Sequence, residues 1–221
     1  MQSSITQSSE GARKGGDPPG SRAASSPGAD APRPPGQRSG GQPLPKGADE
    51  GPIEIIDYDA AWPACYTAER DRLGSLLPEV RLHHIGSTAV PGLAAKPVID
   101  MIALVEDLDA STANAMARAG YWLPSRFNAH LRHRRFLCYP SLSLRTHHLH
   151  FVDAREDLDR CLRFRDLLRD DPELAGRYEV LKRALAARFQ DDREGYTEAK
   201  TPFIAQACRR ADGRSGSNTR A

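Results

Sequence analysis

The sequence predicts an α+β fold, in which a β-sheet is followed by a C-terminal block of helices. Short apolar runs of strand length, separated by turn residues, recur as far as Val152. From Ala154 onward, apolar residues instead recur at the 3.6-residue spacing of helices. Strands first and helices last are typical of α+β domains, whose helices pack together on the sheet.

Two segments lie outside this domain, which we expect over residues 52–208. Residues 1–51 are dominated by Pro, Gly, Ser, Ala and Arg, and such a segment buries too little apolar surface to offset its ordering entropy. We therefore expect a disordered tail there, with a binding or targeting arm as the alternative. A second, shorter disordered end is expected over residues 209–221.

In the first half of the domain, the sequence predicts a strand, a helix and a second strand ahead of a Pro- and Gly-rich loop. Ile53 and Ile55 share one face of a short strand, and a helix follows from Trp62 to about Leu77, next to Pro78. Residues 80–86 then form a strand that ends at a glycine. Beyond a Pro- and Gly-rich loop, the apolar run "VIDMIALV" has the length and composition of a strand.

The second half predicts a short helix over 112–119 that stops at Gly120, and then strands over 135–139 and 146–152. Three helices complete the chain. The second of them begins at Asp171-Pro172-Glu173, which reads as a cap, a first helical position and an acid at the positive helix end.

Composition excludes several classes of protein. The chain of 221 residues has a net charge of +2, which does not indicate a nucleic-acid binder. No apolar run approaches the roughly 20 residues that a membrane helix needs, and there is no secretory signal pattern. The four cysteines form no CxxC pair, which is typical of reduced thiols. We expect a cytoplasmic protein.

Residues 83–101 carry the chemistry. A strand ends at Gly86-Ser87, where a tight turn exposes backbone N–H groups that can cradle a phosphate. Asp100 lies within an apolar strand, where a carboxylate is costly unless it is paired, hydrogen-bonded or bound to a metal. Lys96 could supply the counter-charge. The alternative is that Asp100 and Ser87 serve only the turn.

These residues resemble the signature of the GrpB family. The resemblance is carried by "HIGSTAVPGLAAKPVID" and extends through "YDAAW", "RTHHLHFV", "FRDLLRDDPELAGRYEVLK" and "YTEAK" in family order. It covers about 155 residues, far more than a lone short motif. It implies the nucleotidyltransferase-like superfamily, with a mixed β-sheet and a C-terminal helical block.

In that superfamily, a Gly-Ser element begins the nucleotide site and two acids on the next strand hold two metals. Gly86 and Ser87 match the Gly-Ser element, and Asp100 matches the first acid. The second acid is replaced by Ile102, as in the GrpB pattern generally. A single carboxylate would hold a two-metal centre poorly, so the resemblance leaves catalysis of nucleotidyl transfer open.

His148 and His150 alternate on a predicted strand, so both side chains point to one face. If that strand neighbours the strand of Asp100, the three residues could bind one divalent metal, with magnesium, manganese and zinc as candidates. The alternative is a pair of half-buried histidines bonded to the backbone or to each other. His84 is a further candidate ligand.

Two functional hypotheses follow from the resemblance. The first is an enzyme-like domain that binds a nucleotide or another phosphorylated small molecule through Gly86, Ser87, Lys96, Arg145 and Arg165, with Asp100 and Ser87 as catalytic candidates. The second is a non-catalytic accessory module of the same fold. The family's fusion to dephospho-CoA kinase links the second to coenzyme A metabolism, although this sequence has no Walker-type loop. Nucleic acid is not an expected partner, and the sequence indicates no protein partner.

Overall fold

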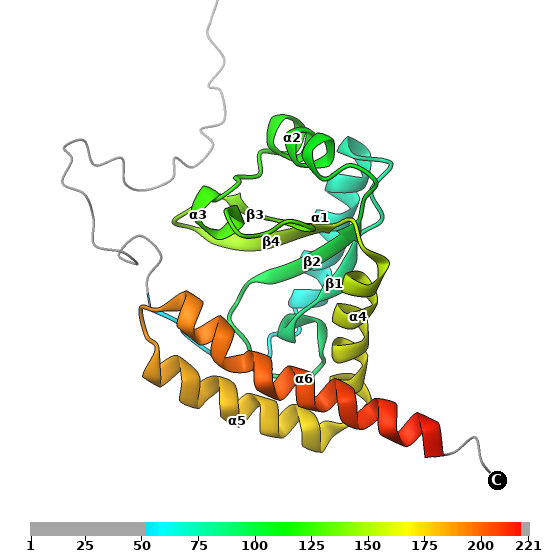
Figure 1. Ribbon diagram of the computed structural model, residues 1–221. Coiled ribbons are helices and arrows are strands. Elements are labelled where there is room, and N and C mark those ends of the chain that lie inside the picture. The colour runs from blue at the N-terminus through cyan, green and yellow to red at the C-terminus, as the bar shows by residue number, and fades with distance from the viewer. Residues whose placement is uncertain (1–51, 218–221) are drawn as a thin grey trace, which may run out of the picture. The chain divides into compact units, whose positions relative to one another are not determined.

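The computed structural model describes residues 52–217, which form a four-stranded mixed sheet with helices on both faces (Figure 1). The strands are β1 (His83–Ile85), β2 (Ile99–Leu104), β3 (Arg134–Pro140) and β4 (Arg145–Val152), in the order β1-β2-β4-β3. β2 runs parallel to β4 and antiparallel to β1, and β3 and β4 form an antiparallel pair. The predicted α+β architecture with a mixed sheet is confirmed.

One face of the sheet carries the main hydrophobic core. Met101, Leu149 and Leu137 from three neighbouring strands are fully buried there, against α1 (Trp62–Leu76) and α2 (Leu108–Ala119). The side chain of Asp107 caps the first turn of α2, and Gly120 ends it with a φ of 73°. That left-handed conformation suits glycine.

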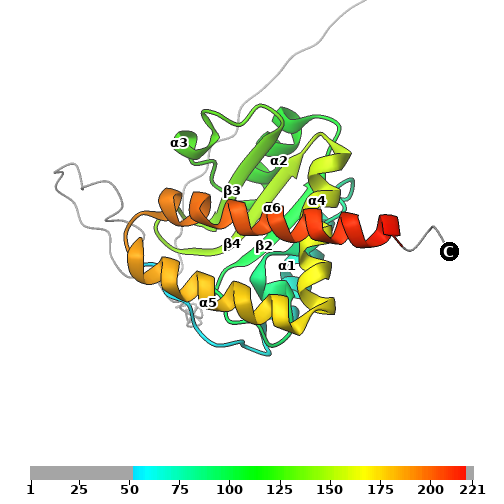
Figure 2. The same cartoon turned by 60° about the horizontal axis from the view of Figure 1, so that its bottom comes forward.

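The opposite face is covered by the C-terminal helices α4 (Arg155–Asp170), α5 (Pro172–Arg188) and α6 (Arg193–Ser217). Ile102 and Val152 pack there against Leu158 of α4. Helix α6 contacts α4 and α5 and crosses in front of β2 and β4 in the view of Figure 2. The Asp171 side chain caps α5, as its sequence predicted.

The structure differs from the expected elements at a few positions. Ile53 and Ile55 do not form a strand: Ile53 packs on Tyr196, and a single bridge joins Ile56 to Ala95. The expected strand over 80–86 is limited to β1, because only His83 to Ile85 pair with β2. The chain turns at Gly86, as expected, into a short 3-10 helix, η1 (Ser87–Ala89). The short helix α3 (Ser125–Asn128) was not expected.

The two expected disordered ends fall largely beyond the described residues. Residues 1–51 and 218–221 lie outside them. At the C-terminal side we expected a loose end from residue 209, whereas α6 continues to Ser217. The part of this helix that precedes residue 209 is anchored by buried side chains such as Tyr196 and Ala207, and its backbone hydrogen bonds carry the helix onward.

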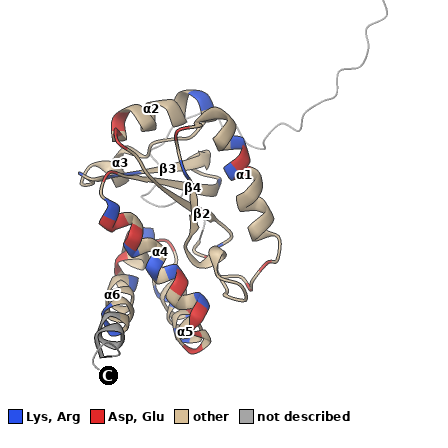
Figure 3. Cartoon of the chain, turned by 90° about the vertical axis from the view of Figure 1, so that its right-hand side faces the viewer, with Lys and Arg blue, Asp and Glu red and all other residues tan. Residues whose placement is uncertain are grey.

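Charged side chains of both signs alternate along the outer surfaces of the helical block. Figure 3 shows Lys and Arg intermixed with Asp and Glu along α4 and α5, and Arg155 pairs with Asp159 one turn away at 2.9 Å. In this view both helices carry residues of both charge signs. None of the helices in the described part of the chain is both long and apolar enough to cross a membrane.

Candidate functional site

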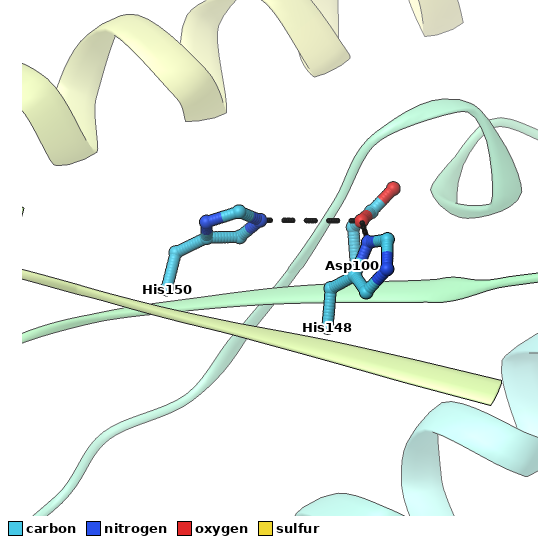
Figure 4. Close-up of side chains that lie close together, drawn as sticks. All are labelled: Asp100, His148 and His150. Carbon is cyan, nitrogen blue, oxygen red and sulfur yellow. Dashed lines mark hydrogen bonds and ion pairs between the residues drawn. The ribbon is translucent and has the colours of Figure 1, made fainter. Parts of the chain in front are cut away.

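Asp100, His148 and His150 converge on the sheet face that the C-terminal helices cover (Figure 4). The parallel pairing of β2 with β4 places Asp100 opposite His148 and Ile102 opposite His150. Nδ1 of His148 lies 2.9 Å, and Nε2 of His150 4.0 Å, from Oδ1 of Asp100. One candidate ligand atom from each residue lies within 4.8 Å of the others. The alternation along the strands therefore produces the cluster that the sequence suggested.

The Gly86-Ser87 turn lies against the same carboxylate. Gly86 has a φ of 72°, and a Cβ added to it would be 2.5 Å from Oδ2 of Asp100. Only glycine allows the backbone to approach so closely. Ser87 follows as the first residue of η1 and is half-buried. The turn and the acid, 14 positions apart in the sequence from Gly86 to Asp100, thus form one site.

The Asp100 carboxylate is held in its ionised form. Burial by itself raises its pKa, but the hydrogen bond from His148 and the positive charges near it outweigh burial and hold the pKa well below its usual range. Lys96 contributes one of those charges. The Asp100 side chain keeps an exposed fraction of 30%, so it is not closed off from solvent.

Burial favours the neutral form of both histidines, and the two rings have different hydrogen-bond partners. Burial lowers the pKa of both rings, most strongly for His150, where the charge of Arg134 adds to the effect. Neutral His148 donates from Nδ1 to Asp100, and its Nε2 is buried without a hydrogen-bond partner among the described residues. His150 accepts at Nδ1 from Nη2 of Arg134 at 2.8 Å. Phe136 packs against both rings.

Two lysines face this cluster from different elements. Lys96, from the loop before β2, lies 5.9 Å from the ring centre of Tyr196, and Lys200 of α6 lies 4.2 Å from the same centre. The pKa of Lys200 is lowered to about 8, chiefly by burial and then by the charge of Lys96, with Asp100 opposing the shift. The carboxylate and both ammonium groups are therefore close enough to influence one another.

Sequence reasoning missed Lys200 and Arg134 as members of this site. Lys200 stands in the family-like segment "YTEAK", to which the sequence alone assigned no role in the site. Arg134 lies on β3 and shares a sheet face with Phe136 and His150. The spacing of Arg134 and Phe136 along a predicted strand was the signal that could have placed both next to the histidines.

Three predicted site residues have other environments. Arg165 pairs with Asp166 and donates to the carbonyl of His84 at 3.0 Å, so it ties α4 to β1. Arg145 donates to the Leu142 carbonyl and lies over the Phe127 ring, and its charge reaches the site by lowering the pKa of His148.

The third is His84, which points to the opposite face of the sheet because β1 pairs it with Met101. There its ring stacks on Tyr66 at 4.5 Å, and its Nε2 lies 3.1 Å from the Thr88 hydroxyl. His84 is therefore not a ligand of a metal at Asp100, contrary to the sequence-based suggestion.

An open surface hollow at the β1 edge of the sheet is separate from this cluster. Its lining includes Tyr66, Arg81 and His83 but not Asp100. Its one acid, Asp71, is paired with Arg70, and its one histidine, His83, belongs to the edge strand β1. The chemistry of the side chains therefore places the candidate site at Asp100 and not at this hollow.

Comparison with known proteins gives a consistent result. Residues 52–210 match the family model described as GrpB protein. The chain is similar to the UPF0157 protein YqkA of Bacillus subtilis, with 37% identity over 70% of this chain and 46% of that protein. It is also similar to the UPF0157 protein PA4798 of Pseudomonas aeruginosa, with 39% identity over 74% of this chain and 69% of that protein. The chain thus spans less than half of the Bacillus relative.

A solved structure has the same fold. The crystal structure of the conserved protein GrpB from Enterococcus faecalis matches with a TM-score of 0.64 and 33% identity, covering 73% of this chain and 99% of that one. A dephospho-CoA kinase of Mycolicibacterium paratuberculosis is 28% identical over 72% of this chain and 46% of its own length.

Proposed function

Since the chain belongs to the GrpB family, we propose that it binds a nucleotide or another phosphorylated small molecule at Asp100, together with one divalent metal. The metal ligands are Asp100, His148 and His150. Lys96 and Lys200 neutralise the phosphate, and the backbone of the Gly86-Ser87 turn lies beside it. The observation that carries the proposal is the convergence of the three ligand residues within 4.8 Å.

The distances suit a metal after a small adjustment. Ligand atoms about 2.0–2.2 Å from a tetrahedral metal are about 3 Å apart from one another. The 2.9 Å between Nδ1 of His148 and Oδ1 of Asp100 is of this size, although the metal must replace the proton that they share. The 4.0 Å to Nε2 of His150 requires a movement of roughly one ångström. A metal held there would polarise a phosphoryl oxygen.

The surroundings favour one metal over two. Ile102 occupies the position of the second acid of the superfamily, and it is fully buried against Ile85, Val152 and Leu158. A carboxylate in that apolar cluster would lack hydrogen-bond partners. The lysines take the role of the second cation, because ammonium groups offset phosphate charge as point charges.

A non-catalytic accessory module is the second candidate. It is favoured by the Asp100–His148 hydrogen bond, which satisfies the carboxylate without any metal. The similarity to a protein named dephospho-CoA kinase points this module toward coenzyme A metabolism. In that case the site would bind a phosphorylated coenzyme A precursor as a recognition element without turning it over.

Metal analysis of the purified protein, followed by titration with nucleotides and coenzyme A precursors, tests the first proposal. We expect about one divalent metal per chain, and affinity for a phosphorylated ligand that falls about tenfold or more in Lys200→Gln, since a hydrogen bond to a charged group contributes about 1.5–3 kcal/mol. Arg209→Gln, an exposed charge change on the same helix, is the matched control and should bind normally. Ligand binding and metal binding that are both unaffected by changes at Asp100 and Lys200 would contradict the site.

Turnover distinguishes the two candidates. Metal-dependent conversion of a bound phosphorylated ligand, lost in Asp100→Asn, supports an enzyme. Tight binding with no product over many hours supports the accessory module.

A further inference from the structure

Arg134 holds His150, one of the proposed metal ligands, in the tautomer that cannot bind a metal through Nε2. Its guanidinium donates to Nδ1 of His150 from Nη2 at 2.8 Å and from Nε at 3.3 Å. Arginine carries only donors and stays protonated in proteins, so Nδ1 must present its lone pair. The proton of the neutral ring is therefore on Nε2, the atom that faces Asp100.

A metal needs the lone pair of Nε2 instead. For His150 to bind a metal, the ring must lose the Nε2 proton and carry one on Nδ1, with no change in its charge. That form would set the N–H of Nδ1 against the N–H groups of Arg134 at hydrogen-bond distance. Two donors facing each other repel, so Arg134 and a metal exclude one another at His150.

An anion that binds nearby would draw the Arg134 guanidinium away from His150. Its guanidinium has no carboxylate partner within the described part of the chain, and it is bonded to a neutral imidazole. An oxyanion gives an arginine bidentate, charge-assisted hydrogen bonds, which are stronger than a bond to a neutral ring. The side chain is also half-buried, where such bonds are less screened.

The same oxyanion would support the metal ligand. A histidine that binds a metal usually donates its other N–H to a carboxylate, a carbonyl or water, which fixes the ring. An oxyanion drawn between Arg134 and His150 accepts from both the guanidinium and Nδ1–H.

We infer that Arg134 couples the two ligands of the site: a phosphate that pairs with Arg134 releases His150 for the metal, so phosphate and metal strengthen each other's binding. This inference rests on the proposed function and adds to it a coupling between the binding of phosphate and the binding of metal. By linkage, the factor by which the anion tightens metal binding equals the factor by which the metal tightens anion binding.

Zinc affinity in the full-length protein tests the coupling. Zinc is titrated in competition with a chromophoric chelator, in sodium chloride and in sodium sulfate of equal ionic strength. Sulfate serves as the tetrahedral oxyanion because it binds free zinc only weakly. The variants are Arg134→Met, which removes the donors but keeps a long stem, and the control Arg132→Met, which removes a neighbouring exposed charge.

We expect sulfate to tighten zinc binding about tenfold in the unaltered protein and in Arg132→Met, a typical size for such coupling. In Arg134→Met, zinc should bind tightly already in chloride, and sulfate should have no effect. Circular dichroism establishes that the variants are folded.

Zinc binding that is equally tight in all three proteins, with the same response to sulfate, would overturn the role of Arg134 and leave the metal site standing. No zinc binding by any of the three would overturn the metal site, and the coupling with it.

Discussion

The carboxylate of Asp100 occupies the place where a side chain at Gly86 would begin. A Cβ there would be 2.5 Å from Oδ2 and 3.1 Å from the Asp100 Cβ. Because real Cβ atoms do not approach other atoms so closely, the turn and the acid cannot be altered independently. This contact also explains the glycine of the Gly-Ser element in terms of the acid it adjoins.

Gly86→Ala should therefore lower both stability and metal affinity. The positive φ of 72° costs an alanine about 1–3 kcal/mol, and the clash displaces the carboxylate in addition. Gly92→Ala is the matched control, since its φ is 77° but nothing lies within 4 Å of an added Cβ. Urea unfolding should show a loss in both variants, whereas zinc titration should show a loss in Gly86→Ala alone. Normal zinc affinity in Gly86→Ala would separate the turn from the site.

Asp100→Asn should destabilise the protein even without metal. The depressed pKa means that the folded structure favours the ionised carboxylate: burial raises the pKa, but the hydrogen bond from His148 and the nearby charges together outweigh burial. A folded pKa below the unfolded value contributes stability above the unfolded pKa near 4, and this is lost as the pH falls through the folded pKa. We expect a loss of about 1–3 kcal/mol at pH 7, with a smaller difference between the two proteins in acid.

Asp153→Asn is the control for this experiment, because among the described residues Asp153 pairs only with the exposed His133, next to the end of β4. Its urea midpoint should stay close to that of the unaltered protein. A midpoint for Asp100→Asn equal to that of the control would show that the carboxylate contributes nothing to the apo fold.

The sequence predicted the strands and helices that carry strong periodicity, and it predicted the cluster of Asp100 with the two histidines. This succeeded because side-chain direction along a strand depends only on alternation, and the one assumption needed was that β2 and β4 are neighbours. The adjacency itself was a condition that the sequence left open, since strand order depends on contacts between residues far apart in the chain.

Lys200 and Arg134 could not be placed in the same way. Lys200 is close enough to influence Asp100 only because α6 folds back across the sheet, and a helical period does not determine where a helix lies. Arg165 shows the opposite error: its family-like segment suggested a ligand, but the adjacent Asp166 and the His84 carbonyl occupy its donors. A local sequence pattern determines which face of a strand or helix a side chain is on, whereas tertiary contacts determine which residues that side chain meets.

Glu69 is a further case: the helical spacing places it on the buried face of α1, but does not explain why a carboxylate is buried there. It falls on the buried face of α1 among apolar residues, with an exposed fraction of 6%. Arg72 pairs with both of its oxygens, and the Tyr121 hydroxyl donates to Oε1 at 2.8 Å. These partners stabilise a charge that burial alone would exclude.

Tyr121→Phe should thus destabilise the fold by about 1.5–3 kcal/mol, the usual contribution of a hydrogen bond to a charged group. Tyr58→Phe removes a hydroxyl that makes no hydrogen bond within the described residues and should be nearly neutral. Chemical unfolding of both variants provides the comparison, and equal midpoints would show that Arg72 alone satisfies Glu69.

His84 should make stability depend on pH on the acid side. Burial is the main cause that lowers its pKa to about 4, the charges of Arg169 and Arg165 add to it, and Asp100 opposes it. In the unfolded chain the pKa is about 6.5. Between these two values the unfolded state binds more protons than the folded state, so stability falls as the pH falls from about 6.5 to about 4. The contribution is complete above this range and constant below it. The slope approaches about 1.4 kcal/mol per pH unit, the value for one proton.

His84→Gln removes this dependence because glutamine does not titrate. The variant should lose some stability at every pH, since the stacking of His84 on Tyr66 is gone, but its unfolding free energy should fall less steeply between pH 6.5 and 4.5. His130→Gln, at an exposed position, should retain the slope of the unaltered protein. Urea titrations at four pH values supply the slopes. Parallel curves for His84→Gln and the unaltered protein would mean that His84 becomes protonated as readily in the folded state as in the unfolded chain, against its burial and its position between Tyr66 and Thr88.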